Sequence, residues 1–154
     1  MSTEAGHRSM NSARHATARW LSNPPSGAGH VYSESHALHG LLFSVPEGEP
    51  RPAETTPGEL LAAAYSTFVA TYLAQALDAD GVPARELVVD MRCLLSPAQD
   101  PPRGIEGLSV EVRGRVDEIE DAEFDDAVRA AWDTCVRLLG LRDDLHTTLD
   151  AALV

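Results

Sequence analysis

The thiols of Cys93 and Cys135 are the strongest potential nucleophiles of the chain. A thiolate attacks peroxides, disulfides and carbonyl groups, provided that its surroundings lower its pKa. The two residues form no Cys-x-x-Cys motif, and each falls on an apolar periodicity, which favours a small buried side chain in both cases. A working nucleophile at Cys135 and a disulfide between the two remain alternatives, the disulfide being disfavoured in a reducing compartment.

Three histidines, His30, His36 and His39, cluster near two expected strands. A metal site needs ligands that converge on one point. A spacing of three along a strand directs side chains to opposite faces, so the pattern predicts no metal site. General acid or base chemistry by one of these imidazoles remains open, and His39 is kept as a candidate pocket residue.

Three aromatic residues, Tyr65, Phe68 and Tyr72, follow one another at spacings of three and four. On a helix this spacing places them on one face. Core packing is the simpler interpretation, and an apolar pocket wall with the Tyr65 hydroxyl as its polar group is the functional one. Glu59, upstream of them, is the expected capping-box residue and a further candidate for the pocket.

One long helix must position these aromatic residues. Thr56 is suited to the N-cap and Pro57 to the first helical position, and no charged residue occurs between Glu59 and Asp78. A surface helix shows a charged face, so we predict that this helix is almost wholly buried and ends before Gly81. Its alanines and the polar side chains at four of its positions argue against a membrane span: Ser66, Thr67, Thr71 and Gln75.

The remaining elements flank this helix. Period-two patterns and turn signals predict strands and one further helix. Asp121 is the expected N-cap of that second helix and Gly140 its end. The segment from 146 to 153 is ambiguous by propensity. Strands are expected over residues 15–21, 30–35, 38–44, 87–95 and 108–116. This order predicts an α+β class with mostly antiparallel sheets.

Composition limits the possible partners. The chain has 154 residues, a formal net charge of −12 and 5% aromatic residues, so it lacks the basic surface that nucleic acids and anionic membranes attract. We expect a disordered tail over residues 1–12 and a single domain over 13–154. The N-terminus shows no apolar signal segment, and the protein is expected in the cytoplasm. No cofactor and no metal are predicted.

The run Thr55-Thr56-Pro57-Gly58-Glu59-Leu60-Leu61-Ala62-Ala63-Ala64-Tyr65 resembles the start of the central helix in the OsmC/Ohr family of thiol peroxidases. Residues 110–116, 124–127 and 131–135 resemble that family's second sheet and second helix, so that the likeness covers residues 15–153. It implies a final strand over 147–153 and an OsmC-like fold, with antiparallel sheets around a long buried central helix plus a second helix. It also implies an intertwined homodimer, in which the N-terminal strands pack with the partner and two pockets lie at the interface.

The sequence departs from this family where its chemistry lies. Aligned from Pro57, the position of the peroxidatic cysteine is Phe68, and that of the glutamate that holds the catalytic arginine is Gly58. Arg51 is the arginine available in the preceding loop. Cys135 matches the family's second cysteine. A phenyl ring is no nucleophile, so the resemblance implies a site without the family's peroxide chemistry.

Three hypotheses follow. The preferred one is an OsmC-like homodimer without thiol peroxidase activity that binds a small apolar molecule at the interface. Such a protein would use Tyr65 or a histidine as proton donor if it also transforms that molecule. The second is a residual organic hydroperoxide reductase that works through Cys135 alone. The third is a structural or regulatory dimer that has no ligand.

Overall fold

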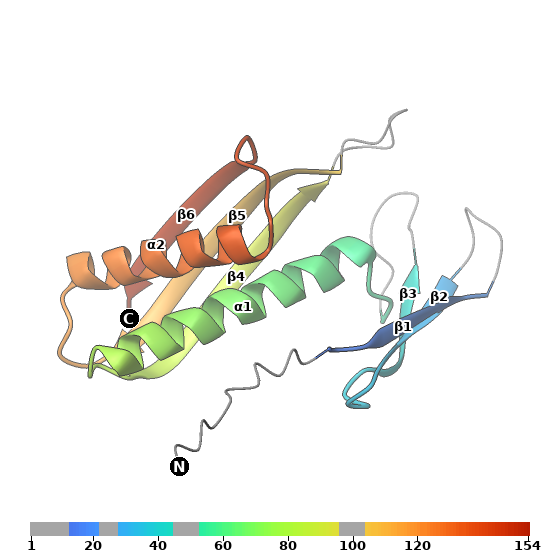
Figure 1. The fold of residues 1–154 in the computed structure, drawn as a ribbon, viewed down its shortest axis with the longest axis horizontal. Helices are drawn as coiled ribbons and strands as arrows, with labels where there is room; N and C mark the ends of the chain where they lie inside the picture. Colours follow the sequence, from blue (N-terminus) through green and yellow to red (C-terminus); the bar gives the residue numbers. More distant parts are fainter. Residues whose placement is uncertain (1–12, 22–27, 45–52, 96–103) are drawn as a thin grey trace, which may run out of the picture. The chain divides into compact units, whose positions relative to one another are not determined.

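The computed structural model describes residues 13–21, 28–44, 53–95 and 104–154. The chain divides into two compact units, Met1–Thr56 and Pro57–Val154, and each is described by itself (Figure 1). The expected tail over residues 1–12 lies outside the described residues. The expectation of a single domain remains a prediction.

The first unit is a three-stranded antiparallel sheet in the order β1-β2-β3. Its strands are β1 (Ala16–Trp20), β2 (Ala28–Ser33) and β3 (His39–Ser44), which confirms the three strands expected before the long helix. Gly29 pairs with Phe43 across β2 and β3, and a Cβ atom at Gly29 would lie 2.6 Å from the Phe43 ring. Glycine is therefore required where the aromatic ring crosses the sheet.

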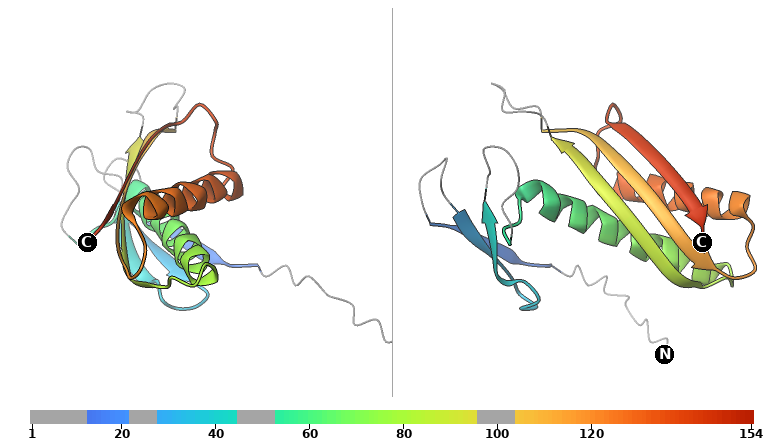
Figure 2. Two further views of the ribbon diagram at one scale, coloured as in Figure 1. Left: turned by 90° about the vertical axis from the view of Figure 1, so that its left-hand side faces the viewer. Right: turned by 180° about the vertical axis from the view of Figure 1, so that it is seen from behind.

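The second unit packs two helices on one face of a second three-stranded sheet, as Figure 2 shows edge-on. Its elements are α1 (Pro57–Ala79), β4 (Ala84–Leu95), β5 (Ile105–Val116), α2 (Asp121–Leu138) and β6 (His146–Leu153). The α+β class is confirmed, and so is the final strand. The expectation of mostly antiparallel sheets is confirmed, and the exception is that β5 and β6 run parallel. The reason is that α2 returns the chain to the end of the sheet where β5 began.

The ends of both helices follow from local hydrogen bonds. Gly81 takes a positive φ of 79° after α1, and Gly140 a φ of 62° after α2, as expected for left-handed caps. The predicted N-cap Asp121 is wrong by one residue, since the cap is Glu120. The backbone N–H of Glu120 donates to the Glu123 carboxylate over 3.1 Å. This capping-box hydrogen bond makes Glu120, and not Asp121, the N-cap.

The core of the second unit lies between the sheet and the helices. Phe124 of α2 is fully buried above Gly114 of β5, where a Cβ atom would overlap its ring. The buried apolar side chains come from α1, β4, β5 and α2: Val69, Leu73, Leu77, Met91, Leu108, Val110, Val112, Phe124, Val128, Ala131, Trp132 and Cys135.

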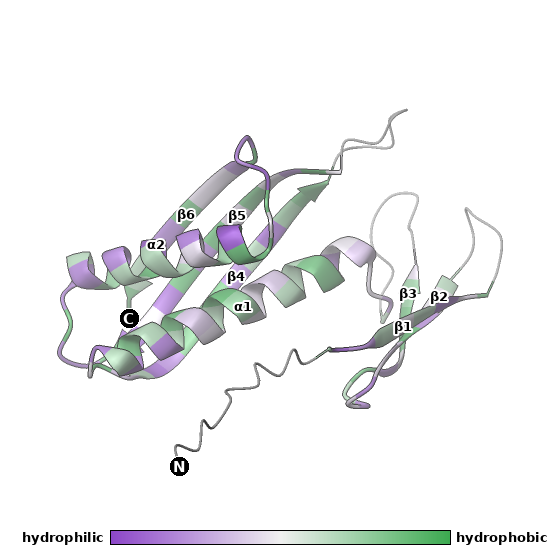
Figure 3. Cartoon of the chain, viewed as in Figure 1, coloured by the Kyte–Doolittle hydropathy of each residue, from purple (hydrophilic) through white to green (hydrophobic). Residues whose placement is uncertain are grey.

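The prediction that α1 is almost wholly buried is wrong for this chain. Its fully buried side chains are Val69, Leu73 and Leu77, which form one stripe at a spacing of four. Between Glu59 and Asp78 the helix carries no charged side chain, and much of it is green or white in Figure 3, yet no described element of its own unit covers the side that bears Phe68. A helical sequence without charged residues predicts a helix that is buried. It does not predict whether the helix is buried by its own chain or by another one.

Among the described residues, α1 is also the helix whose length and mean hydropathy of 1.4 would suffice to cross a membrane. Core helices of water-soluble proteins meet the same criterion. The expectation that α1 spans no membrane remains a prediction.

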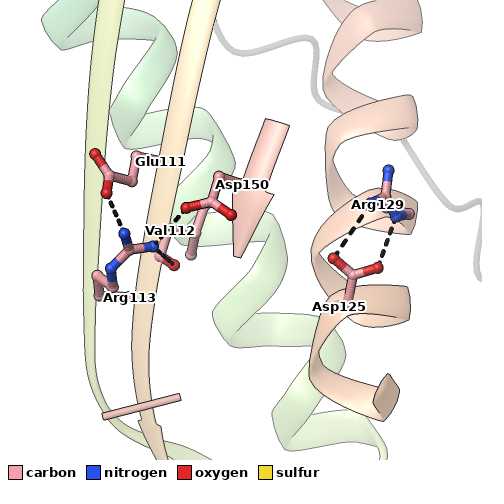
Figure 4. A network of polar contacts seen from close by, with 6 residues as sticks. All are labelled: Glu111, Val112, Arg113, Asp125, Arg129 and Asp150. Carbon is pink, nitrogen blue, oxygen red and sulfur yellow. Dashed lines mark hydrogen bonds and ion pairs between the residues drawn. The ribbon is translucent and has the colours of Figure 1, made fainter. Parts of the chain in front are cut away.

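The face of the second sheet that is turned away from the helices carries charged side chains. Arg113 of β5 contacts the carboxylates of Glu111 and Asp150, the latter at 3.1 Å (Figure 4). On the outer side of α2, Arg129 pairs with Asp125 at 2.7 Å, one helical turn away. These pairs mark water-exposed surfaces, so the polar faces of the unit are the outer sheet face and the outer side of α2.

Candidate functional site

Phe68 and Tyr72 lie together on α1. Their ring centroids are 6.4 Å apart and their planes differ by 11°, which is a stacked pair one helical turn apart. The Phe68 side chain is 42% exposed, whereas Tyr72 is partly buried against the core. Phe68 is therefore an exposed ring supported by a second ring.

Tyr65, one turn earlier, contributes to a cavity of about 260 Å³. The cavity lies between α1, the start of β5 and the loop from α2 to β6, and Phe68 does not line it. Its other lining residues are Ile105, Leu139, Gly140, Leu141, Arg142 and Leu145. The three aromatic residues were expected to form one pocket wall. Instead, Phe68 and Tyr72 form the exposed ring pair, and Tyr65 lines this cavity.

The Tyr65 hydroxyl stays protonated at neutral pH. Burial raises the pKa of Tyr65 above its ordinary value, and the charge of the neighbouring Cys93 raises it further. Cys93 faces the helices from β4 and is partly buried, and burial raises its pKa as well. Tyr65 is therefore suited to donate a hydrogen bond or a proton and unsuited to act as a base at neutral pH.

Cys135 lies on the buried face of α2 with none of its surface exposed. Burial raises the pKa of its thiol, so the neutral form predominates at neutral pH. This confirms the interpretation of Cys135 as a small core residue. Both Cys93 and Cys135 are free thiols.

The remaining candidates are Glu59, His39 and Arg51. Glu59, in the first turn of α1, lines a groove of about 320 Å³ beside β4 together with Asp90. His39 begins β3 in the first unit, where its ring makes an edge-on contact with Tyr32. Arg51 lies outside the described residues.

The histidines are arranged differently from the expectation. His36 is in the turn before β3 with a φ of 60°, so the alternation of a strand does not apply to it. Its ring lies 6.0 Å from that of His39. No group of three or more His, Cys, Asp or Glu side chains is placed to hold a metal ion within the described parts of the chain.

The sequence analysis missed the loop after α2. Leu141, Arg142 and Leu145 line the Tyr65 cavity, yet none of them belongs to a recognisable motif. The available signal was Arg142, which stands between Leu141 and Leu145 directly after Gly140, the residue that ends the helix. An isolated arginine in a loop predicts a surface position, and only the fold brings it beside Tyr65.

Comparison with known proteins agrees with this architecture. Residues 48–149 match the family described as OsmC-like protein. Three similar solved structures are the organic hydroperoxide resistance protein OhrB of Bacillus subtilis (TM-score 0.67, 18% identity, 91% of this chain and 98% of that one), an OsmC-like protein of Mycoplasma pneumoniae (0.72, 13%, 94% and 99%) and an organic hydroperoxide resistance protein of Elizabethkingia anophelis with thiocyanate bound (0.70, 21%, 93% and 97%). No curated protein sequence matches.

The matched range covers more than half of the chain, and the chain therefore belongs to the OsmC-like protein family. The solved structures show the same fold at identities between 13% and 21%. At such identities they establish the fold and not the activity.

Proposed function

We propose that this chain is a member of the OsmC-like family that forms a homodimer, lacks thiol peroxidase activity and binds a small apolar molecule beside Phe68. The carrying observation is the exposed ring of Phe68, stacked on Tyr72, at the position where the family's peroxidatic cysteine aligns. A phenyl ring cannot form the sulfenic acid by which a thiol reduces a peroxide.

Neither cysteine is suited to replace that thiol. Peroxide reduction needs an accessible thiolate, and burial favours the neutral thiol at both Cys93 and Cys135. In the described parts of the chain no arginine pairs with either sulfur. This weighs against the residual peroxidase that works through Cys135.

The ring pair supports binding of an apolar molecule. Stacked aromatic rings offer a rigid apolar surface at a small cost in side-chain entropy. The same side of α1 is poor in charge, and in a homodimer a second copy would close it into a pocket. The intertwined dimer rests on the resemblance to the family.

The proposal is tested first by following the consumption of cumene hydroperoxide with a dithiol reductant. We expect no turnover from the wild type above the protein-free rate, and none from Cys135→Ser. Turnover by the wild type that is lost in Cys135→Ser would overturn the proposal and assign the chemistry to that thiol.

Binding is then measured with Nile red, an uncharged apolar dye. We expect fluorescence enhancement with the wild type and a decrease of at least about fivefold in affinity with Phe68→Ala, since a buried aromatic contact contributes about 1 kcal/mol or more. Gln75→Ala, on an exposed position of the same helix, is the matched control. Equal binding by Phe68→Ala would contradict a site at this residue.

The third hypothesis, a dimer without a ligand, also has an observation in its favour. Phe68 and Tyr72 stack on each other, so each ring already has an apolar partner within the chain. If the dye binds neither variant nor wild type while the protein remains dimeric, the exposed face of α1 serves association alone.

A further inference from the structure

The cavity beside Tyr65 is lined by aliphatic side chains, except for Tyr65 itself and Arg142. Its walls are Ile105, Leu139, Leu141 and Leu145, which offer only methyl and methylene groups. Tyr65 and Arg142 supply the polar side chains of the lining. The volume of about 260 Å³ is close to the lower end of small-molecule sites, roughly 300 Å³. Apolar side chains beside the two polar ones and the backbone groups of the loop fit a ligand that has one polar end.

Arg142 determines the charge of that end. Its Nε atom lies 3.3 Å from the Asp144 carboxylate, and one terminal nitrogen donates to the Ile105 carbonyl oxygen over 3.4 Å. Both contacts are long and involve single atoms, so the guanidinium retains unused N–H donors. The side chains of Arg142 and Asp144 are both mostly exposed, and of the two only Arg142 lines the cavity, at its rim; Asp143 does not line it.

A planar guanidinium matches a carboxylate with two parallel hydrogen bonds. The two neighbouring aspartates and the net charge of −12 oppose a doubly charged head group such as a phosphate ester more strongly than a singly charged one. An amine would be attracted to Asp144 but repelled by the arginine that lines the cavity. Charge and shape therefore agree on a monoanion.

We propose that this cavity is a binding site for a small amphipathic carboxylate, with its apolar chain between Ile105 and the leucines and its head group on Arg142. Tyr65 lines the same cavity, and its protonated hydroxyl can donate a second hydrogen bond. All lining residues belong to the unit Pro57–Val154, and neither Phe68 nor a second subunit is needed. The inference is therefore independent of the proposed function.

The test compares three probes of equal chain length, octanoate, 1-octanol and octylamine, by titrating the ¹⁵N-labelled full chain and following its backbone amide shifts. We expect the shifts with octanoate to concentrate at Gly140, Leu141 and Leu145. Octanoate should bind about tenfold more tightly than 1-octanol and more tightly still than octylamine. Equal affinities for octanoate and octylamine, or shifts that concentrate elsewhere, would overturn the proposal.

Variants separate the head-group contact from the apolar walls. Arg142→Gln should weaken octanoate binding about tenfold and leave 1-octanol unaffected, while Arg142→Lys should retain part of the affinity. Leu145→Phe should reduce the binding of both probes by filling the cavity. Arg137→Gln, an exposed arginine of α2 outside the lining, is the matched control and should bind like the wild type. Unchanged octanoate affinity in Arg142→Gln would contradict the assignment.

Failure here and failure of the proposed function are distinguishable. Phe68→Ala should leave octanoate binding unchanged, because Phe68 does not line the cavity. A loss of octanoate binding in Phe68→Ala would place the carboxylate at the ring pair and overturn the assignment to Arg142.

Discussion

Phe68 stacks on Tyr72 at 6.4 Å on a side of α1 that no described element of the unit Pro57–Val154 covers. A phenylalanine that is 42% exposed, on an apolar helix with only 17% of an 18-residue stretch buried, is unusual for an isolated chain. A second copy of the chain that covered this side of α1 would remove the exposed apolar surface from water.

If the proposed homodimer buries Phe68 in its interface, Phe68→Glu should shift the protein from dimer to monomer, because the variant would bury a carboxylate without a partner there. Sedimentation velocity over a range of concentrations measures the change, with far-UV circular dichroism to confirm folding. Ala122→Glu introduces the same charge in the first turn of α2, where it is exposed and should have no effect. A wild type that is monomeric at every concentration would refute the association.

Several features of the fold could be predicted because their causes are local. Gly81 and Gly140 end the helices, and the alternation around Val110 and Val112 marks β5. The parallel pairing of β6 was not predictable in this way, because strand direction depends on where α2 returns the chain. Period-two patterning is the same in parallel and antiparallel strands.

The site was predictable only in part. The spacing of Phe68 and Tyr72 anticipated their contact, since residues four apart on a helix are neighbours. Arg142 was missed, because it lies near the end of the unit's sequence and Tyr65 near its start. Only the folded chain brings the loop that contains Arg142 beside Tyr65. Contacts at long sequence separation need the tertiary fold and carry no local signal.

The two thiols make stability sensitive to alkaline pH. Burial raises the pKa of Cys93 and of Cys135 in the folded state, so at a pH near the ordinary thiol value of about 8.5 the folded chain binds more protons than the unfolded chain. Stability is then fully present below that pH and falls as pH rises through the folded pKa values. Urea unfolding at pH 7.5, 8.5 and 9.5 with a non-thiol reductant should show this decline.

The slope should be smaller in a variant that carries both Cys93→Ala and Cys135→Ala, although its stability at pH 7.5 is also lower because of the lost packing. A slope equal to that of the wild type would mean that the thiols are not the titrating groups.

Gly114 and Phe124 are coupled by direct packing. A Cβ atom at Gly114 would overlap the fully buried Phe124 ring, so Gly114→Ala should destabilise the chain by about 1–3 kcal/mol through overpacking. Combining it with Phe124→Leu should recover part of that loss, which a double-mutant cycle by urea unfolding measures. Glu106→Ala, at an exposed position of the same strand, is the control. Additive effects of the two substitutions would contradict the contact.

Arg113 bridges two carboxylates that the sheet itself places opposite each other. Glu111 and Asp150 are register partners across the parallel strands β5 and β6, and the Arg113 guanidinium contacts both (Figure 4). Like charges directly opposite in a sheet are destabilising, so Arg113→Ala removes the attraction and also exposes the repulsion. We expect a loss of about 1 kcal/mol in the free energy of unfolding, reduced by high salt. Adding Asp150→Asn should restore most of the loss, whereas Arg129→Ala, on the surface of α2 near Asp125, Asp126 and Asp133, separates no pair of carboxylates in sheet register and should cost less. If Arg113→Ala and Arg129→Ala cost the same and Asp150→Asn gives no recovery, the opposed carboxylates do not repel measurably and the sheet pairing rests on its apolar face alone.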